Sequence, residues 1–191
     1  MKKLALSLAL SGIILAGPAF AEDQDISHGM TIYGRLETAK NDCTVLMSKY
    51  IIALSQSDKY LPDQGTTLGS ERADEKIYVQ LGGEHCNAEE NYNHIGLKFI
   101  GEADKFGGET LANVNTGSDA ATGIGIQLTD IQNQILTPNV TISKFPRTKA
   151  GSDPATTTAS FPLYFTLVKL KNQTATPGKV QTNLTVQIER I

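Results

Sequence analysis

Apolar and polar residues alternate with a period of two along much of the chain. Ile77, Val79 and Leu81 share one face of such a stretch, with Tyr78 and Gln80 between them. Successive side chains of a strand point to opposite faces, so this alternation predicts half-buried strands. The same pattern recurs at Met30 to Leu36, Val45 to Met47, Ile95 to Phe99, Ile124 to Leu128, Phe161 to Leu167 and Leu184 to Ile188.

Turn-forming residues separate these stretches. They gather at Pro62-Asp-Gln-Gly65, Gly82-Gly83, Gly107-Gly108 and Pro177-Gly178. Residues 50–54 suit either a helical turn or a strand, because the Ile51-Ile52 pair is β-branched. Residues 148–160 are interpreted as a surface loop. At least seven short strands at this spacing predict an all-β, antiparallel sandwich.

The first twenty-one residues have the pattern of a secretory signal peptide. Lys2 and Lys3 precede an apolar run, which Gly17-Pro18 ends, and small residues follow at Ala19 and Ala21. The run is shorter than the ~20 residues that span a membrane, so export is favoured over a membrane anchor. We therefore expect cleavage after residue 21.

The net charge argues against a nucleic-acid partner. The 191 residues hold 17 basic and 20 acidic groups, and loss of Lys2 and Lys3 would leave 15 basic groups against 20 acidic ones. Nucleic-acid binding needs a basic footprint, which this balance does not supply.

The two cysteines are expected to form a disulfide. An exported chain enters an oxidising compartment, where a single pair is normally bonded. Cys43 and Cys86 would close a loop of about 43 residues. A reactive or metal-bound thiol is the alternative, although the chain has no C-x-x-C motif.

Catalytic and cofactor motifs are missing from the sequence. There is no G-x-S-x-G elbow, and Gly123-Ile-Gly125 lacks the third glycine of a dinucleotide fingerprint. Inside a strand pattern such glycines indicate a bulge or a close backbone approach. The acidic and histidine residues between Glu84 and His94 match no metal motif. We expect no enzyme activity, no cofactor and no metal site.

The region after the signal peptide is a short polar arm that runs into strand pattern. Ile26, Met30 and Ile32 share one parity, with His28 between them. Such an arm can add a strand to an exposed sheet edge, with backbone bonds for registry and alternate side chains for pockets. A frayed terminus is the alternative.

The chain resembles the chaperone–usher pilins, in particular the type 1 fimbrial major-subunit family, over essentially all of residues 22–191. The resemblance rests on the order and spacing of four features. These are an arm with Gly29 ahead of Asp42-Cys-Thr-Val45, the strand Ile77 to Leu81 ahead of Cys86, the block from Phe99 through Asn115-Thr-Gly117 to Gly123–Asp130, and Ala175-Thr-Pro-Gly178 before a terminal strand.

The resemblance implies an incomplete immunoglobulin-like sandwich that lacks its last strand and is completed by donor-strand exchange. Residues 1–21 would be the signal peptide, 22–32 the donor-strand arm and 33–191 the pilin domain. The expected partners are a periplasmic chaperone, an outer-membrane usher and neighbouring pilin subunits. The chain would pass through the periplasm into a cell-surface fimbrium that supports cell adhesion.

The resemblance also assigns residue roles. Gly29 would pass the shallowest pocket of the groove, and the other arm residues in question are Ile26, His28, Met30 and Ile32, with a register that stays open by one residue. Leu184, Val186 and Ile188 would form the acceptor-groove terminal strand. The family's next-to-last aromatic is replaced by Arg190, so the choice between major and minor subunit stays open.

A self-contained secreted β-sandwich that binds a ligand, such as a lectin-like module, is the alternative function. It would fold without help from a neighbour, whereas a pilin would not.

Overall fold

The computed structural model describes residues 29–31, 43–83, 86, 92 and 94–191. Within this part the chain forms strands and two single-turn 3-10 helices, η1 (Asp58–Tyr60) and η2 (Ser70–Arg72). The strands are β1 (Gly29–Thr31), β2 (Thr44–Met47), β3 (Ile51–Ala53), β4 (Glu75–Gly82), β5 (Ile95–Ile100), β6 (Leu111–Ala112), β7 (Ile124–Thr129), β8 (Ile142–Lys144), β9 (Phe161–Lys169) and β10 (Thr185–Arg190).

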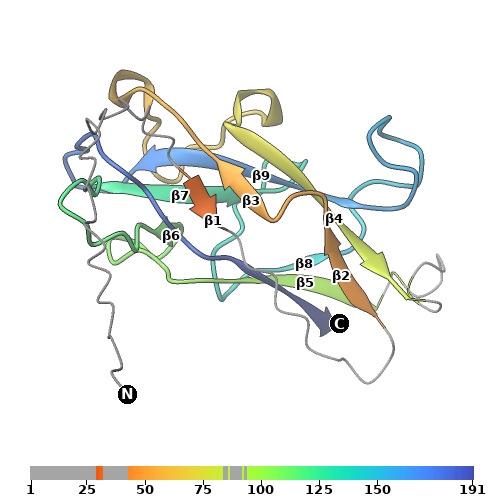
Figure 1. Cartoon of the computed structure of the whole chain (residues 1–191). Helices are drawn as coiled ribbons and strands as arrows, with labels where there is room; N and C mark the ends of the chain where they lie inside the picture. Colours follow the sequence, from red (N-terminus) through yellow and green to blue (C-terminus); the bar gives the residue numbers. More distant parts are fainter. Residues whose placement is uncertain (1–28, 32–42, 84–85, 87–91, 93) are drawn as a thin grey trace, which may run out of the picture.

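Two antiparallel sheets face each other as a sandwich of the immunoglobulin-like kind (Figure 1). The larger sheet has the order β2-β4-β9-β7-β6, and the smaller has the order β10-β5-β8. A further pair joins β1 to β3. The all-β sandwich expected from the sequence is confirmed.

The core lies between the two sheets, where the alternating apolar residues meet. Ile77, Leu97 and Phe161 are completely buried there, and the rings of Phe99 and Phe161 lie 5.6 Å apart. Burying such side chains removes apolar surface from water at about 25 cal/mol per Å². The period of two read from the sequence therefore marks the faces that hold the sandwich together.

Strand β9 is buried on both faces. Leu163 and Phe165 point into the core, whereas Val168 of the opposite phase is also buried. Beside the strand, the Lys169 amide donates a hydrogen bond to the Pro62 carbonyl, and Asp63 forms a parallel bridge with Lys169. A continuous apolar run is typical of a strand that is buried on both faces.

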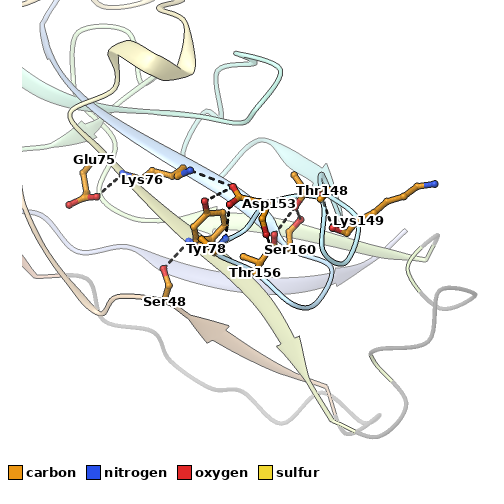
Figure 2. A network of polar contacts seen from close by, with 11 residues as sticks. Ser48, Glu75, Lys76, Tyr78, Thr148, Lys149, Asp153, Thr156 and Ser160 are labelled. Atoms are coloured by element: carbon orange, nitrogen blue, oxygen red, sulfur yellow. Dashed lines mark hydrogen bonds and ion pairs between the residues drawn. The ribbon is translucent and has the colours of Figure 1, made fainter.

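The loop between β8 and β9 folds over the outer face of β4 and β9 (Figure 2). Tyr78 of β4 donates its hydroxyl to Asp153 at 2.5 Å, and the Lys76 amine lies 3.6 Å from the same carboxylate. Thr148 and Ser160 close the loop's base with hydrogen bonds between their backbones in both directions. The stretch 148–160, interpreted as a surface loop, is thus fastened to the sheet.

The disulfide between Cys43 and Cys86 is confirmed, with a Cα–Cα distance of 5.5 Å. Cys43 immediately precedes β2, and Cys86 follows the end of β4. Because Thr44 is the register partner of Gly82, the bond closes the end of the β2–β4 ladder.

The glycines at the start of β7 mark close backbone approach, as the sequence predicted. Gly123 has φ of +66°, and a Cβ there would lie 2.3 Å from the carbonyl oxygen of Thr174. A Cβ on Gly125 would collide with the side chains of Thr110 and Leu170 and would lie 3.2 Å from the backbone carbonyl oxygen of Leu111. Glycine at positions 123 and 125 therefore lets neighbouring chain segments pack closely against the start of β7.

Candidate functional site

The predicted donor arm falls partly within the structure. Gly29 and Met30 lie in β1, whereas Ile26, His28 and Ile32 lie outside the described residues. So do the predicted signal peptide and the residues between Glu84 and His94 other than Cys86, Tyr92 and His94. The roles predicted for the arm stay predictions.

The strand β1 forms an antiparallel ladder with β3. The register runs from Gly29 opposite Ala53 to Thr31 opposite Ile51. Within the described residues β3 pairs with no other strand. The segment at 50–54, left open between helical turn and strand, therefore contains a strand at an edge.

The terminal strand β10 lies at the edge of the smaller sheet. It pairs antiparallel with β5, from Thr185 opposite Ile100 to Arg190 opposite Ile95, and in the described part of the chain its other edge carries no strand. Unpaired N–H and C=O groups along such an edge can accept another strand.

The three residues predicted for the acceptor strand alternate toward the core. Leu184, which precedes β10, and Val186 within it are buried, and Ile188 packs against the core while remaining partly exposed. Thr185 and Gln187 lie between them in the polar phase. The structure places all three on one face of the terminal segment.

A cavity of about 220 Å³ is lined in part by the chain that leads into β10. It is larger than the ~150 Å³ apolar cavity that can hold a benzene molecule. Its wall combines the chain after β3, the larger sheet and the segment that leads into β10. The apolar residues of the wall are Leu54, Leu61, Ile124, Ile126, Leu167 and Val180.

The sequence does not predict this cavity. Its residues come from four separate segments, and only Ile124, Ile126 and Leu167 belonged to predicted strands. Pro177 and Gly178, which the sequence marked as a turn, also line it. The turn at Pro177-Gly178, close to the terminal strand, is the one sequence feature that points to this part of the cavity.

A half-buried carboxylate braces one wall of the cavity. Asp74 accepts hydrogen bonds from the backbone N–H of Leu167 at 2.7 Å and from the side-chain amide of Gln56 at 3.2 Å. Burial raises the pKa of Asp74, and these two hydrogen bonds partly oppose the rise. The carboxylate therefore joins β9 to the chain that follows β3.

The hydrogen bond between Tyr78 and Asp153 shifts the pKa values of both groups. Burial raises the pKa of the Tyr78 hydroxyl, and its hydrogen bond to Asp153 adds to the rise. That same hydrogen bond is the main cause of the lowered pKa of Asp153. Both groups are committed to each other and to Lys76, which lies 4.7 Å from the centre of the Tyr78 ring.

Reactive groups do not converge in the described part of the chain. No three His, Cys, Asp or Glu side chains among those residues gather closely enough to hold a metal ion. Nor is any helix found there of the length and apolar character needed to cross a membrane. The candidate site is an apolar cavity lined by the chain after β3 and the chain before β10, two segments next to edge strands, and such a site suits association with another chain.

Comparison with protein families decides what kind of chain this is. The family model for fimbrial proteins matches residues 30–189. The chain belongs to the fimbrial protein family. A search of the curated proteins finds no match.

Membership gives the coarse function. Fimbrial proteins are structural, non-enzymatic subunits that assemble with other subunits into a pilus, a cell-surface appendage. An association site is what such a subunit needs, and the strand edges and cavity described above are where the fold offers one.

Proposed function

We propose that this fimbrial protein polymerises by donor-strand exchange. The arm, residues 22–32, of one subunit would complete the sandwich of the next, and the resulting fimbria would support cell adhesion. Residues 1–21 would direct the chain into the periplasm, and residues 33–191 would form the pilin domain that accepts the neighbour's arm.

Two observations carry the proposal: the outer edge of β10 has no strand neighbour among the described residues, and an apolar cavity is lined by the chain that leads into β10. The cavity is lined by Val180 ahead of β10 and by Leu54 just after β3. A strand added here would gain backbone hydrogen bonds from the edge and place an apolar side chain in the cavity.

The terminal residues then take specific roles. Leu184, Val186 and Ile188 would form the acceptor side, and Ile26, Met30 and Ile32 of the incoming arm would supply apolar side chains. At Gly29 the arm would pass the shallowest part of the groove, where a larger side chain would collide with its floor.

An uncovered edge beside apolar surface favours aggregation. A periplasmic chaperone would therefore cover the site before assembly, and an outer-membrane usher would order the addition of subunits. These partners are part of the proposal and follow from the family resemblance.

Two variants with complementary defects test the exchange. Deletion of residues 22–32 should give a subunit that accepts but cannot donate. Val180→Phe should fill the cavity from inside and give a subunit that donates but cannot accept, since Val180 is buried in the wall. Each alone should stay monomeric, and an equal mixture should stop at heterodimers, as measured by light scattering after size exclusion.

Val140→Phe is the matched control, because Val140 is 71% exposed and does not line the cavity. It should polymerise like the parent chain. Circular dichroism checks that Val180→Phe folds, and Leu54→Phe is the replacement if it does not. Fibres from the arm-deleted chain, or a mixture of the two variants that stays monomeric, would refute donor-strand exchange. The second result would favour the self-contained binding module.

A further inference from the structure

The residues of β1 have a partner within their own chain. β1 runs antiparallel beside β3, and Met30 is the register partner of Ile52, whose side chain is buried (Figure 1). Residues 32–50 connect the two strands. Among the described residues, β1 is the only strand that pairs with β3.

The same three residues belong to the proposed arm. A backbone N–H or C=O group engaged with β3 of its own chain is not available for a ladder with a neighbouring subunit. The edge of β3 is likewise occupied, and this strand leads directly to Leu54 in the wall of the cavity. Self-pairing thus engages both the donor and one border of the acceptor site.

We propose that the unassembled subunit caps itself by pairing Gly29–Thr31 with β3, and that assembly requires this pairing to open. The inference rests on the proposed donor-strand exchange and adds its regulation. A subunit in the capped state neither donates nor accepts efficiently. Capping would also reduce the exposed edge that makes an incomplete sandwich prone to aggregate.

The short ladder makes the cap reversible. Two strands of three residues are marginal as an isolated pair in water. The arm of residues 22–32 is longer than the segment paired with β3, so a ladder formed along its whole length would make more backbone bonds. The cap should therefore delay exchange and yield to it.

A cysteine pair reports the capped state directly. In an antiparallel ladder, opposite residues have Cα atoms about 4.5–5.5 Å apart, which a disulfide can span. Thr31→Cys with Ile51→Cys should form an intramolecular disulfide in the dilute, unassembled subunit under air oxidation. Mass spectrometry of peptides distinguishes it from the native Cys43–Cys86 bond.

Thr31→Cys with Ser55→Cys is the matched control. Ser55 is exposed like Ile51 but lies four residues further along, roughly 13 Å at strand rise. Cross-linking of the Ile51 pair at ten times the yield of the Ser55 pair, or more, supports the cap. Equal yields, or bonds formed only between molecules, would overturn it.

Hydrogen exchange gives a second readout without added cysteines. Removal of residues 22–32 should speed exchange of the β3 amides by about tenfold or more and leave the β9 amides unchanged. Unchanged β3 exchange would overturn the cap. The two proposals fail separately. If only the cap is wrong, the mixture of arm-deleted and Val180→Phe chains still dimerises. If only strand exchange is wrong, the cross-link between positions 31 and 51 still forms, but that mixture does not associate.

Discussion

At the scale of single residues, Asp74 supports a wall of the cavity although its burial disfavours the charged form of its carboxyl group. It holds the backbone N–H of Leu167 and the amide of Gln56. Burial nevertheless raises its pKa, which means that the folded state favours the protonated form. The group thus costs stability when it is ionised.

The consequence can be tested with Asp74→Asn. A carboxyl whose pKa is raised in the folded state contributes stability below its unfolded pKa, and this is lost as the pH rises through the folded pKa. Asparagine should therefore raise the free energy of unfolding at pH 7 by less than about 1 kcal/mol, which appears as a higher melting temperature. The gain should vanish at pH 3. Thermal melts at both values measure it.

Asp119→Asn is the contrasting control for this prediction. The hydrogen bond from Lys179 lowers the pKa of Asp119, so its stabilising effect exists above the unfolded pKa and is lost on acidification. That variant should be slightly less stable than the parent at pH 7 and equal to it at low pH. A gain at neutral pH in both variants would contradict the assignment to Asp74.

At the scale of elements, the disulfide fixes where the β2–β4 ladder ends. Replacing both Cys43 and Cys86 with alanine removes a constraint on a loop of about 43 residues, for which chain entropy gives ~4 kcal/mol as an upper value. The midpoint of urea unfolding should fall accordingly. Reduction of the parent should produce the same shift, and a free thiol in the unfolded, unreduced parent would contradict the bond.

Elements differ in how well the sequence predicts them. β4, β5, β7, β9 and β10 are long enough for their alternation to stand out. β8 was not predicted, because it reverses the usual order: Ile142 is 47% exposed and Ser143 is buried. The buried hydroxyl is satisfied by the guanidinium of Arg147 at 3.3 Å, a contact that no local pattern announces. β6, with two residues, was missed for its length.

Only the part of the candidate site that lies on a strand with a clear alternating pattern could be predicted from the sequence. The acceptor residues of the terminal strand follow from periodicity together with the family resemblance. The cavity does not, because Leu54, Ile126 and Val180 become neighbours only when both sheets and their connections are in place. The pairing of β1 with β3 likewise needs the register of strands separated by a connecting segment.

At the scale of the whole molecule, completion of the sandwich should be measurable without any fibre. A synthetic peptide of residues 22–32, added to the chain that lacks them, should bind the folded state alone and raise its melting temperature with concentration. The gain should reach about 2.7 kcal/mol at one hundred times the dissociation constant. Calorimetry across a peptide titration measures it.

The matched peptide carries Gly29→Leu. If the arm passes a shallow part of the groove at this position, the leucine peptide should stabilise the chain far less at equal concentration. Identical shifts from the two peptides would show that the glycine has no such role.

The loop fastened over β4 also separates two surfaces of the subunit. Its contacts with Tyr78 and its closure at Thr148 and Ser160 lie on the outer face of the larger sheet (Figure 2). The cavity, in contrast, is lined by Ile124, Ile126 and Leu167, which belong to the core between the sheets. A Cβ on Gly151, at the exposed tip, would meet no atom within 4 Å. A foreign peptide inserted at this tip would therefore leave every residue that lines the cavity unchanged.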